Sequence, residues 1–294
     1  MSKFINWIIL LVLAVIWGTS FILIKKGLES FSSFQIANLR IFISFIFLLP
    51  VAIKNIRKVT KGSIWSFLII GFIGSAFPAY LYPLAQTHIE SSVAGMLNSL
   101  TPVFTLIIGI AIYSQKALLR QVLGIFLGFV GAAGLLYKGS FSFDTYGLLI
   151  VLATLFYGIS SNQVTRLKGI NGLAITSLAF LFIGPIAGVN LLLSDFSAAV
   201  ETEHWLRNLS YIGILSIFGS GLALAIFNIL ILRTTPVFAS SVTYLIPIVA
   251  SIWGLFDGED IKSSMIISVI CILLGVYLTN RKSFNRKNAA SENT

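Results

Sequence analysis

The sequence predicts an all-α integral membrane protein with ten transmembrane helices, arranged as two inverted five-helix repeats. The prediction comes from the composition, from a series of long apolar runs, and from motifs that recur in the two halves. Of the 294 residues, 57% are hydrophobic and 10% are charged, whereas an ordinary soluble domain has about 25% charged residues. A chain of this composition, with a mean hydropathy of +0.96, cannot fold as a water-soluble globule.

Ten apolar runs supply the predicted helices. A hydrocarbon core about 30 Å thick needs about 20 apolar residues per helical span. Runs of about that length lie at residues 6–24, 36–53, 64–83, 92–112, 118–137, 145–164, 172–193, 209–231, 238–256 and 263–280. Only Arg40 in the second run and Arg120 in the fifth carry a charge. The runs are continuous, whereas the strands of a membrane β-barrel alternate apolar and polar residues, which argues against a β-barrel.

The charges in the loops predict how the chain is oriented. With ten spans, one side of the membrane holds 14 of the 20 lysines and arginines, and the other side holds five of them together with nine of the ten acidic residues. Basic residues concentrate in cytoplasmic loops, so we expect a multi-pass protein of the plasma membrane with both termini in the cytoplasm. The net charge of +10 is then explained by topology and not by nucleic acid.

The two halves of the sequence share a pattern. Pro102 matches Pro247 at a spacing of 145 residues, and "WGTSF" at 17–21 matches "YGISS" at 157–161. Five spans per copy is an odd number, so the second copy must be inserted upside down, an arrangement that recurs in secondary transporters. The expected domains are a first repeat at 1–140, a second, inverted repeat at 141–282, and a disordered cytoplasmic tail at 283–294.

Several motifs resemble those of a known transporter family. They are "WGTSF", "NLRIFIS" entering the second run, "HIESSVAGMLNSLTPVFTLIIG" around the fourth, "GIFLGFVGAAGLLY" in the fifth and "VFASSVTYLIPIVASIWGLFDGE" in the second half. In this order they resemble the EamA-type transporters of the drug/metabolite transporter superfamily. The resemblance implies ten helices in two inverted halves, a central cavity, and transport of metabolites such as amino acids, often outward. One departure is Gln115, which stands where the family usually has a glutamate, whereas Glu259 keeps that glutamate in the second half.

Ten polar or aromatic residues inside the runs are the expected substrate-binding residues. Aromatic side chains offer broad cavity walls, and a hydroxyl or amide group in a span bonds either to a neighbouring helix or to a polar ligand. In the third run, Pro78 and Pro83 free backbone carbonyls that only protein or water can satisfy at membrane depth, which favours a cavity there. The expected residues are Trp17, Ser20, Arg40, Tyr80, Tyr82, Asn98, Ser99, Tyr157, Asn228 and Tyr244.

Arg40 is the charged residue that lies well inside a run. A charge at the centre of a bilayer costs about 2.5–3.5 kcal/mol on insertion scales, which makes Arg40 a candidate for a functional role. The alternative is a structural role, in which the guanidinium reaches the lipid headgroups or the carbonyls of a helix end. Both interpretations fit the sequence.

The predicted function is a secondary membrane transporter that exports small organic metabolites, such as amino acids, by alternating access. A channel, a lipid flippase and a non-transporting membrane sensor are the alternatives. An enzyme is not expected, because no run contains the Asp, Glu or His that an intramembrane protease needs, and no ATP-binding motif is present. Cys271 is the single cysteine, so a disulfide or a cysteine-based metal site within one chain is excluded.

The same features define the expected partners. We expect a small-molecule substrate and membrane lipids, and we expect no cofactor, metal ion or nucleic acid. The sequence leaves the oligomeric state open.

The predicted topology is testable with single cysteines in intact cells. Lys58→Cys and Arg166→Cys should be shielded from a membrane-impermeant thiol reagent, because both positions lie on the predicted cytoplasmic side, whereas Ser197→Cys should be labelled. Labelling of the first two variants without permeabilisation would overturn the predicted order of the spans.

Overall fold

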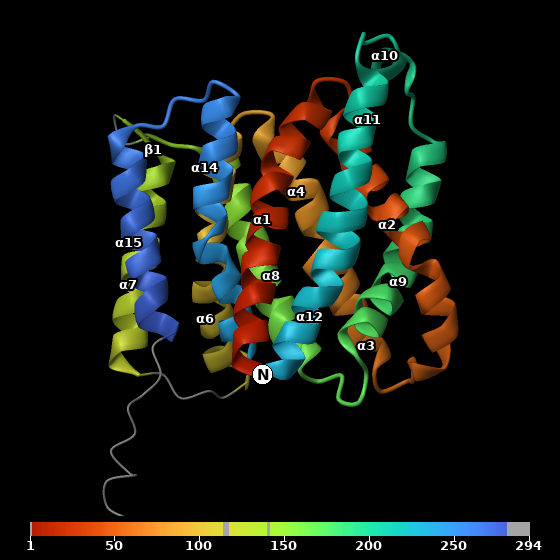
Figure 1. The fold of residues 1–294 in the computed structure, drawn as a ribbon, viewed down its shortest axis with the longest axis horizontal. Coiled ribbons are helices and arrows are strands. Elements are labelled where there is room, and N and C mark those ends of the chain that lie inside the picture. The colour runs from red at the N-terminus through yellow and green to blue at the C-terminus, as the bar shows by residue number, and fades with distance from the viewer. Residues whose placement is uncertain (1, 114–117, 140–141, 281–294) are drawn as a thin grey trace, which may run out of the picture.

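The structure is a computed structural model that describes residues 2–113, 118–139 and 142–280. The predicted tail at 283–294 and Gln115 lie outside these residues. Within the described ranges the chain is almost entirely helical, which confirms the all-α part of the predicted fold class (Figure 1).

The first half of the chain begins with two long helices and continues with two helical segments that change their geometry part-way. Its elements are α1 (Ser2–Leu28), α2 (Ser33–Asn55), the 3₁₀ turn η1 (Ile56–Lys58), α3 (Ile64–Leu68), the π-helix η2 (Ile69–Ala76), α4 (Phe77–Gln86), α5 (Ser91–Leu97), the 3₁₀ turn η3 (Asn98–Leu100), α6 (Thr101–Tyr113) and α7 (Leu119–Leu136). A short antiparallel pair of strands, β1 (Tyr137–Gly139) and β2 (Ser142–Phe143), follows α7.

The second half has the same order of long, π-containing and 3₁₀-containing segments. Its elements are α8 (Thr145–Val164), α9 (Gly172–Leu192), α10 (Ser197–Val200), α11 (Trp205–Ile214), the π-helix η4 (Leu215–Leu222), α12 (Ala223–Arg233), α13 (Pro236–Ser240), the 3₁₀ turn η5 (Ser241–Tyr244), α14 (Ile246–Phe256) and α15 (Ser263–Asn280).

In the part of the chain that the structure describes, eight helical segments are long and apolar enough to cross a membrane. They are Phe4–Leu28, Ser33–Lys58, Ile64–Gln86, Ser91–Tyr113, Thr145–Val164, Gly172–Leu192, Trp205–Arg233 and Pro236–Phe256. The fifth and tenth predicted runs form shorter apolar helices at Leu119–Leu135 and Ser263–Leu278. The count of ten spans and the inversion of the second half therefore remain predictions.

Proline explains the breaks in the fourth and ninth runs. Proline has no backbone N–H, and its ring clashes with the preceding turn of a helix. The 3₁₀ turn η3 ends two residues before Pro102, and η5 ends three residues before Pro247. In both runs the α-helical geometry is thus interrupted on the N-terminal side of the proline, near the middle of the segment.

Helices α7 and α15 lie against each other at one edge of the bundle (Figure 1). Their contact depends on glycine, because a Cβ atom on Gly131 would lie 2.5 Å from the carbonyl oxygen of Ser268, and one on Gly275 would lie 2.5 Å from that of Gly124. Small residues let membrane helices approach backbone to backbone. The glycines of the fifth run therefore serve helix packing.

Helix α1 runs through the middle of the bundle and contacts α5, α12 and α14 (Figure 1). Its first half is buried in an apolar cluster that contains Leu13 together with Phe67, Leu178 and Leu230. Its second half packs in another cluster, which includes Phe21. The second half also lines the cavity that forms the candidate site, from Trp17 to Ile24.

Candidate functional site

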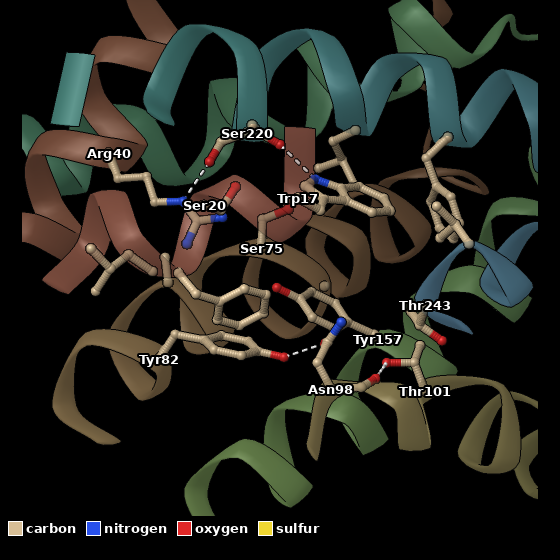
Figure 2. A pocket seen from close by; sticks show the side chains of 18 of the residues that line it. Trp17, Ser20, Arg40, Ser75, Tyr82, Asn98, Thr101, Tyr157, Ser220 and Thr243 are labelled. Carbon is tan, nitrogen blue, oxygen red and sulfur yellow. Dashed lines mark hydrogen bonds between the residues drawn. The ribbon is translucent and has the colours of Figure 1, made fainter. Parts of the chain in front are cut away.

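An internal cavity of about 90 Å³ lies among the helices. A water molecule needs about 10–15 Å³ by the same measure, so the cavity has room for a small organic ligand. Each of the eight membrane-length segments contributes at least one lining residue, and both halves of the chain therefore build one site. Polar and aromatic lining residues are drawn in Figure 2.

Six of the ten residues expected from the sequence line this cavity. They are Trp17, Ser20, Arg40, Tyr82, Asn98 and Tyr157 (Figure 2). The structure thus brings together residues from α1, α2, α4, η3 and α8, which are far apart in the sequence.

Tyr80 and Asn228 lie outside the cavity lining and bond to neighbouring helices. The Tyr80 hydroxyl donates to Oδ1 of Asn38 at 2.7 Å, which joins α4 to α2. The Asn228 amide donates to Oγ1 of Thr176 at 2.9 Å, which joins α12 to α9. In hydrocarbon, a polar side chain that faces a neighbouring helix is satisfied by such a bond.

Ser99 and Tyr244 also lie outside the lining. The Ser99 hydroxyl donates to the carbonyl oxygen of Thr243 at 3.1 Å and is fully buried. The Tyr244 hydroxyl donates to the carbonyl oxygen of Val276 on α15 at 2.7 Å. The structure therefore gives these two residues a role in holding the fourth, ninth and tenth runs together.

Several lining residues were missed from the sequence. Phe180 and Phe227 are apolar, so nothing in the sequence distinguishes them from the other apolar residues of their runs. Ser75 and Ser220 lie in the π-helices η2 and η4, where five-residue hydrogen-bond spacing replaces the α-helical spacing and changes which residues face inward. Thr101 could have been predicted, because it is a polar residue directly before Pro102 and one turn after Asn98 in the fourth run.

Trp17 joins the two halves across the cavity wall. Its indole Nε1 donates to the carbonyl oxygen of Gly219 in η4 at 2.9 Å, and its ring meets that of Phe227 edge to face with centroids 5.1 Å apart. A Cβ atom on Gly219 would lie 3.1 Å from Oγ of Ser20, so glycine lets η4 approach α1 closely. Trp17 therefore serves both as cavity wall and as a contact between the halves.

Arg40 supplies the positive charge of the cavity. Its Nε donates to Oγ of Ser220 at 2.5 Å, again across the halves, and the Tyr157 side chain is a further polar neighbour. The hydroxyls of Ser20 and Ser75 lie near the guanidinium in the same part of the cavity (Figure 2). Among the described residues, no Asp or Glu lines the cavity and none forms an ion pair with Arg40.

A second polar group lies elsewhere in the cavity lining. The Tyr82 hydroxyl donates to Oδ1 of Asn98, and the Tyr82 ring stacks on Tyr157 with centroids 6.1 Å apart. Thr101 donates to the backbone carbonyl of Asn98 at 2.8 Å, which fixes the 3₁₀ turn η3. The lining therefore combines aromatic walls with a few hydroxyl and amide groups, the usual composition of a small-molecule site.

A network of ion pairs closes the end of the bundle at which α1 finishes, here called the Lys25 end. The Lys25 ammonium lies 2.8 Å from a carboxylate oxygen of Asp257, 2.8 Å from one of Glu259 and 3.2 Å from one of Glu90. Lys25 directly follows Ile24, which lines the cavity. The network thus lies next to the cavity on this side, and it joins α1 and the start of α5 in the first half to the loop after α14.

Glu259 is the most buried member of this network, with a side chain 1% exposed. It accepts hydrogen bonds from the backbone N–H groups of Ser91 at 3.0 Å and Ser92 at 2.9 Å, at the N-terminus of α5, where the helix dipole favours a negative charge. Burial opposes ionisation of the carboxyl group. The hydrogen bonds from Lys25, Ser91 and Ser92 outweigh burial and lower its pKa to about 2.

The opposite end of the cavity, here called the N-terminal end, is closed by different chemistry. Leu10, Leu13 and Ala14 of α1 are buried in one apolar cluster that also contains Phe67 of α3 and Leu178 of α9. This closure is apolar. The two ends of the cavity are therefore held shut by an ion-pair network and by hydrophobic packing.

The described residues offer no metal site, since they contain no group of three or more His, Cys, Asp or Glu side chains that could hold an ion. The one cysteine, Cys271 on α15, is a free thiol outside the cavity lining.

Comparison with known proteins places the whole chain beside membrane transporters. The model of the EamA-like transporter family matches residues 5–137 and again residues 145–281. The uncharacterized inner membrane transporter YedA of Escherichia coli (strain K12) is 26% identical over 286 residues, which covers 92% of this chain and 90% of that protein. An uncharacterized transporter of Archaeoglobus fulgidus is 24% identical over 94% of this chain and 99% of its own.

Two further matches concern a named substrate and a fold. The S-adenosylmethionine/S-adenosylhomocysteine transporter of Chlamydia trachomatis is 24% identical, over 93% of this chain and 88% of that protein. A solved crystal structure superposes with a TM-score of 0.65 at 15% identity and covers 100% of both chains, which shows a shared fold.

The Glu259 network predicts a loss of stability in acid. Its folded pKa of about 2 lies below the reference value of 4.5, so its ionisation stabilises the fold at neutral pH, and this contribution is lost as the pH falls from 4.5 towards 2. The thermal unfolding temperature of the purified protein in detergent should therefore fall in that window. Glu259→Gln should unfold at a lower temperature at pH 7 and show a weaker dependence on acid.

Glu203 provides the matched control, because its side chain is 88% exposed. Glu203→Gln should keep the acid dependence of the unmodified protein. Identical acid profiles for Glu259→Gln and the unmodified protein would show that the network does not stabilise the fold.

Proposed function

The chain belongs to the EamA-like transporter family, and from that premise we propose that it is a secondary carrier that exports small organic metabolites, such as amino acids, by alternating access. Its long apolar helices and its transporter relatives make it a multi-pass membrane protein. The observation that carries the proposal is the cavity lined by both halves of the chain, with an ion-pair network next to one end and an apolar cluster next to the other.

The repeated order of elements supports two inverted repeats at 1–140 and 141–282. The π-helices η2 and η4 begin at Ile69 and Leu215, and the 3₁₀ turns η3 and η5 begin at Asn98 and Ser241. The two π-helices, and likewise the two 3₁₀ turns, lie in segments that correspond to each other in the sequence repeat. Two similar bundles around one site are able to rock and expose it to either side in turn.

The contacts at the two ends support alternating access. Opening the Lys25 end requires Glu259 to leave the N-terminus of α5, and opening the N-terminal end requires the apolar cluster that contains Leu13 to separate. The two closures share no residue, so each is able to open while the other stays shut. On the loop charges, we place the Lys25 end outside the cell and both termini in the cytoplasm.

A carrier fits these contacts better than a channel. A channel needs a continuous polar path, whereas the cavity is separated from the N-terminal end by buried apolar side chains such as Leu10 and Leu13. The cavity wall is also mostly aromatic and aliphatic, with hydroxyl and amide groups at a few positions, which suits an amphipathic metabolite.

The lining favours transport driven by the gradient of the substrate itself. Coupling to protons commonly uses a carboxylate or a histidine at membrane depth. No Asp, Glu or His among the described residues lines the cavity, and Arg40 keeps its proton at cellular pH. We therefore propose facilitated efflux.

Counterflow in proteoliposomes tests this function. A compound that stabilises the purified protein in a screen of amino acids, nucleosides and amphipathic drugs is loaded in excess, and uptake of its labelled form is measured. Labelled compound should accumulate transiently without a pH or Na⁺ gradient, and neither gradient should drive a neutral or zwitterionic compound uphill. Accumulation that persists under an imposed pH gradient would contradict facilitated efflux.

Two tyrosines make a matched pair for the same assay. Tyr82→Phe removes a hydroxyl that lies in the cavity and bonds to Asn98, so counterflow should slow several-fold. Tyr80→Phe removes a hydroxyl that bonds to Asn38 outside the cavity, so it should lower stability with a smaller effect on transport per folded molecule. Equal effects of the two variants would place the site elsewhere.

A further inference from the structure

We propose that the Arg40 side of the cavity binds the carboxylate of the substrate, and that the preferred substrate is a small organic acid with one negative charge and an apolar body. The inference rests on the proposed function and narrows it, because it separates organic anions from amino acid zwitterions, neutral compounds and amines. It follows from the charge balance of the cavity and from the position of its aromatic walls.

The charge balance gives the sign of the ligand. Arg40 is the one charged side chain among the described residues that line the cavity, and its guanidinium stays protonated in a protein. Glu90, Asp257 and Glu259 pair with Lys25, and Glu29 pairs with Lys26, all at the Lys25 end and outside the cavity lining of the described residues. The cavity therefore holds one positive charge for which these ranges supply no counter-ion.

The hydrogen bonds of Arg40 leave donors for a ligand. A guanidinium carries five N–H donors. The contact with Ser220 uses the one on Nε, and Tyr157 is a second hydrogen-bond neighbour, so further donors remain. A carboxylate accepts two parallel N–H bonds from a guanidinium, which makes this pair strong and specific. The hydroxyls of Ser20 and Ser75 lie in the same part of the cavity, where they donate to the carbonyl oxygens of Ile16 at 3.0 Å and of Ile70 at 3.3 Å (Figure 2). Either hydroxyl would have to turn away from its carbonyl to donate to a carboxylate oxygen.

The rest of the lining describes the body of the ligand. Trp17, Phe21, Phe180 and Phe227 present aromatic surface and line the same cavity as Arg40. An aromatic or branched aliphatic group buried there gains about 25 cal/mol for each Å² of apolar surface removed from water. The site thus combines one anion-binding side with an apolar chamber.

The same balance disfavours positive groups. An ammonium group on the ligand would add a second positive charge to a cavity of low dielectric constant, with no carboxylate among the described lining residues to pair with it. A monoanion neutralises the positive charge of Arg40. A zwitterion and a neutral compound each carry no net charge, so with either of them bound the cavity keeps its charge of plus one. The expected order of binding is acid first, then amide and zwitterion, then amine.

The proposed carboxylate site also adjoins a contact between the two halves, the hydrogen bond from Arg40 to Ser220. Ser220 belongs to η4 in the second half, and it holds Arg40 of the first half through a single hydrogen bond. A carboxylate on the remaining N–H donors of Arg40 would bind directly beside this contact. The anion site therefore adjoins a contact that the two halves must rearrange during transport.

A matched series of compounds with one phenyl body tests the proposal. The series is 3-phenylpropanoate, 3-phenylpropanamide, phenylalanine and phenethylamine, which differ in charge and little in size. Binding is measured as thermal stabilisation of the full-length protein over a range of concentrations, and transport as counterflow in proteoliposomes. The acid should bind about tenfold or more tightly than each of the other three, the size expected for charge-assisted hydrogen bonds.

Variants of two arginines give the matched control. Arg40→Gln should weaken binding of the acid about 10- to 100-fold and change binding of the amide less than threefold, because a bond to a charged group is lost only for the acid. Arg40→Lys keeps the charge and should retain part of the preference for the acid. Arg233→Gln removes an equal charge from an exposed position at the end of α12 and should bind all four compounds as the unmodified protein does.

The outcomes separate this inference from the carrier function. Equal binding of acid, amide and amine, an unchanged affinity of Arg40→Gln for the acid, or no stabilisation by any compound at millimolar concentration would overturn the anion site. Counterflow of the four compounds without preference would overturn it and leave the carrier standing. Binding in the predicted order without counterflow would support the anion site and contradict the carrier. Should Arg40→Gln fail to fold, the order of binding to the unmodified protein and to Arg40→Lys still decides the question.

Discussion

The structure depends on one constraint: at membrane depth no water is available to satisfy polar groups, so the protein must do so itself. For the backbone the constraint produces helices. For side chains it leaves two environments, a bond to a neighbouring helix or a position in an internal cavity. Tyr80 and Tyr82, two residues apart on α4, illustrate both, since Tyr80 bonds to Asn38 on α2 whereas Tyr82 lies in the cavity. Their different roles follow from the side of one helix on which each lies.

The same constraint gives the two ends of the cavity different properties. At the Lys25 end, charged groups lie near the end of α1, and Glu259 is held by Lys25 and by the N-terminus of α5. At the N-terminal end, Leu13 and its neighbours exclude water by packing alone. Ion pairs respond to acid and salt, whereas apolar packing does not, so conditions in solution are expected to act mainly on the Lys25 end.

The sequence predicts the helical class and the positions of all the long apolar segments, because hydrophobic runs report burial in lipid or protein directly. It also predicts residues that bear an unusual group inside a run, such as Arg40 and Trp17. It does not predict which way a helix is rotated, and for that reason Ser99 and Tyr244 were expected in the cavity although both bond to backbone carbonyls. Ser75 and Ser220 were not predicted as lining residues, because the π-helices change which residues face inward. The role of Glu259 was not predicted, because its partners lie more than 160 residues away in the chain.

In the proposed mechanism, one cavity opens to either side in turn, and the contact of Glu259 with α5 keeps the Lys25 end shut. The most direct measurement is the rate at which a cysteine in the cavity reacts with an impermeant thiol reagent added from each side of vesicles of known orientation. Ser75→Cys in a Cys271→Ser background places a thiol of similar size among the lining residues. We expect the thiol of Ser75→Cys to react slowly from both sides, and to react faster from the Lys25 side alone when Glu259→Gln is added. Reaction from one side only in every variant, or rates that Glu259→Gln leaves unchanged, would contradict it.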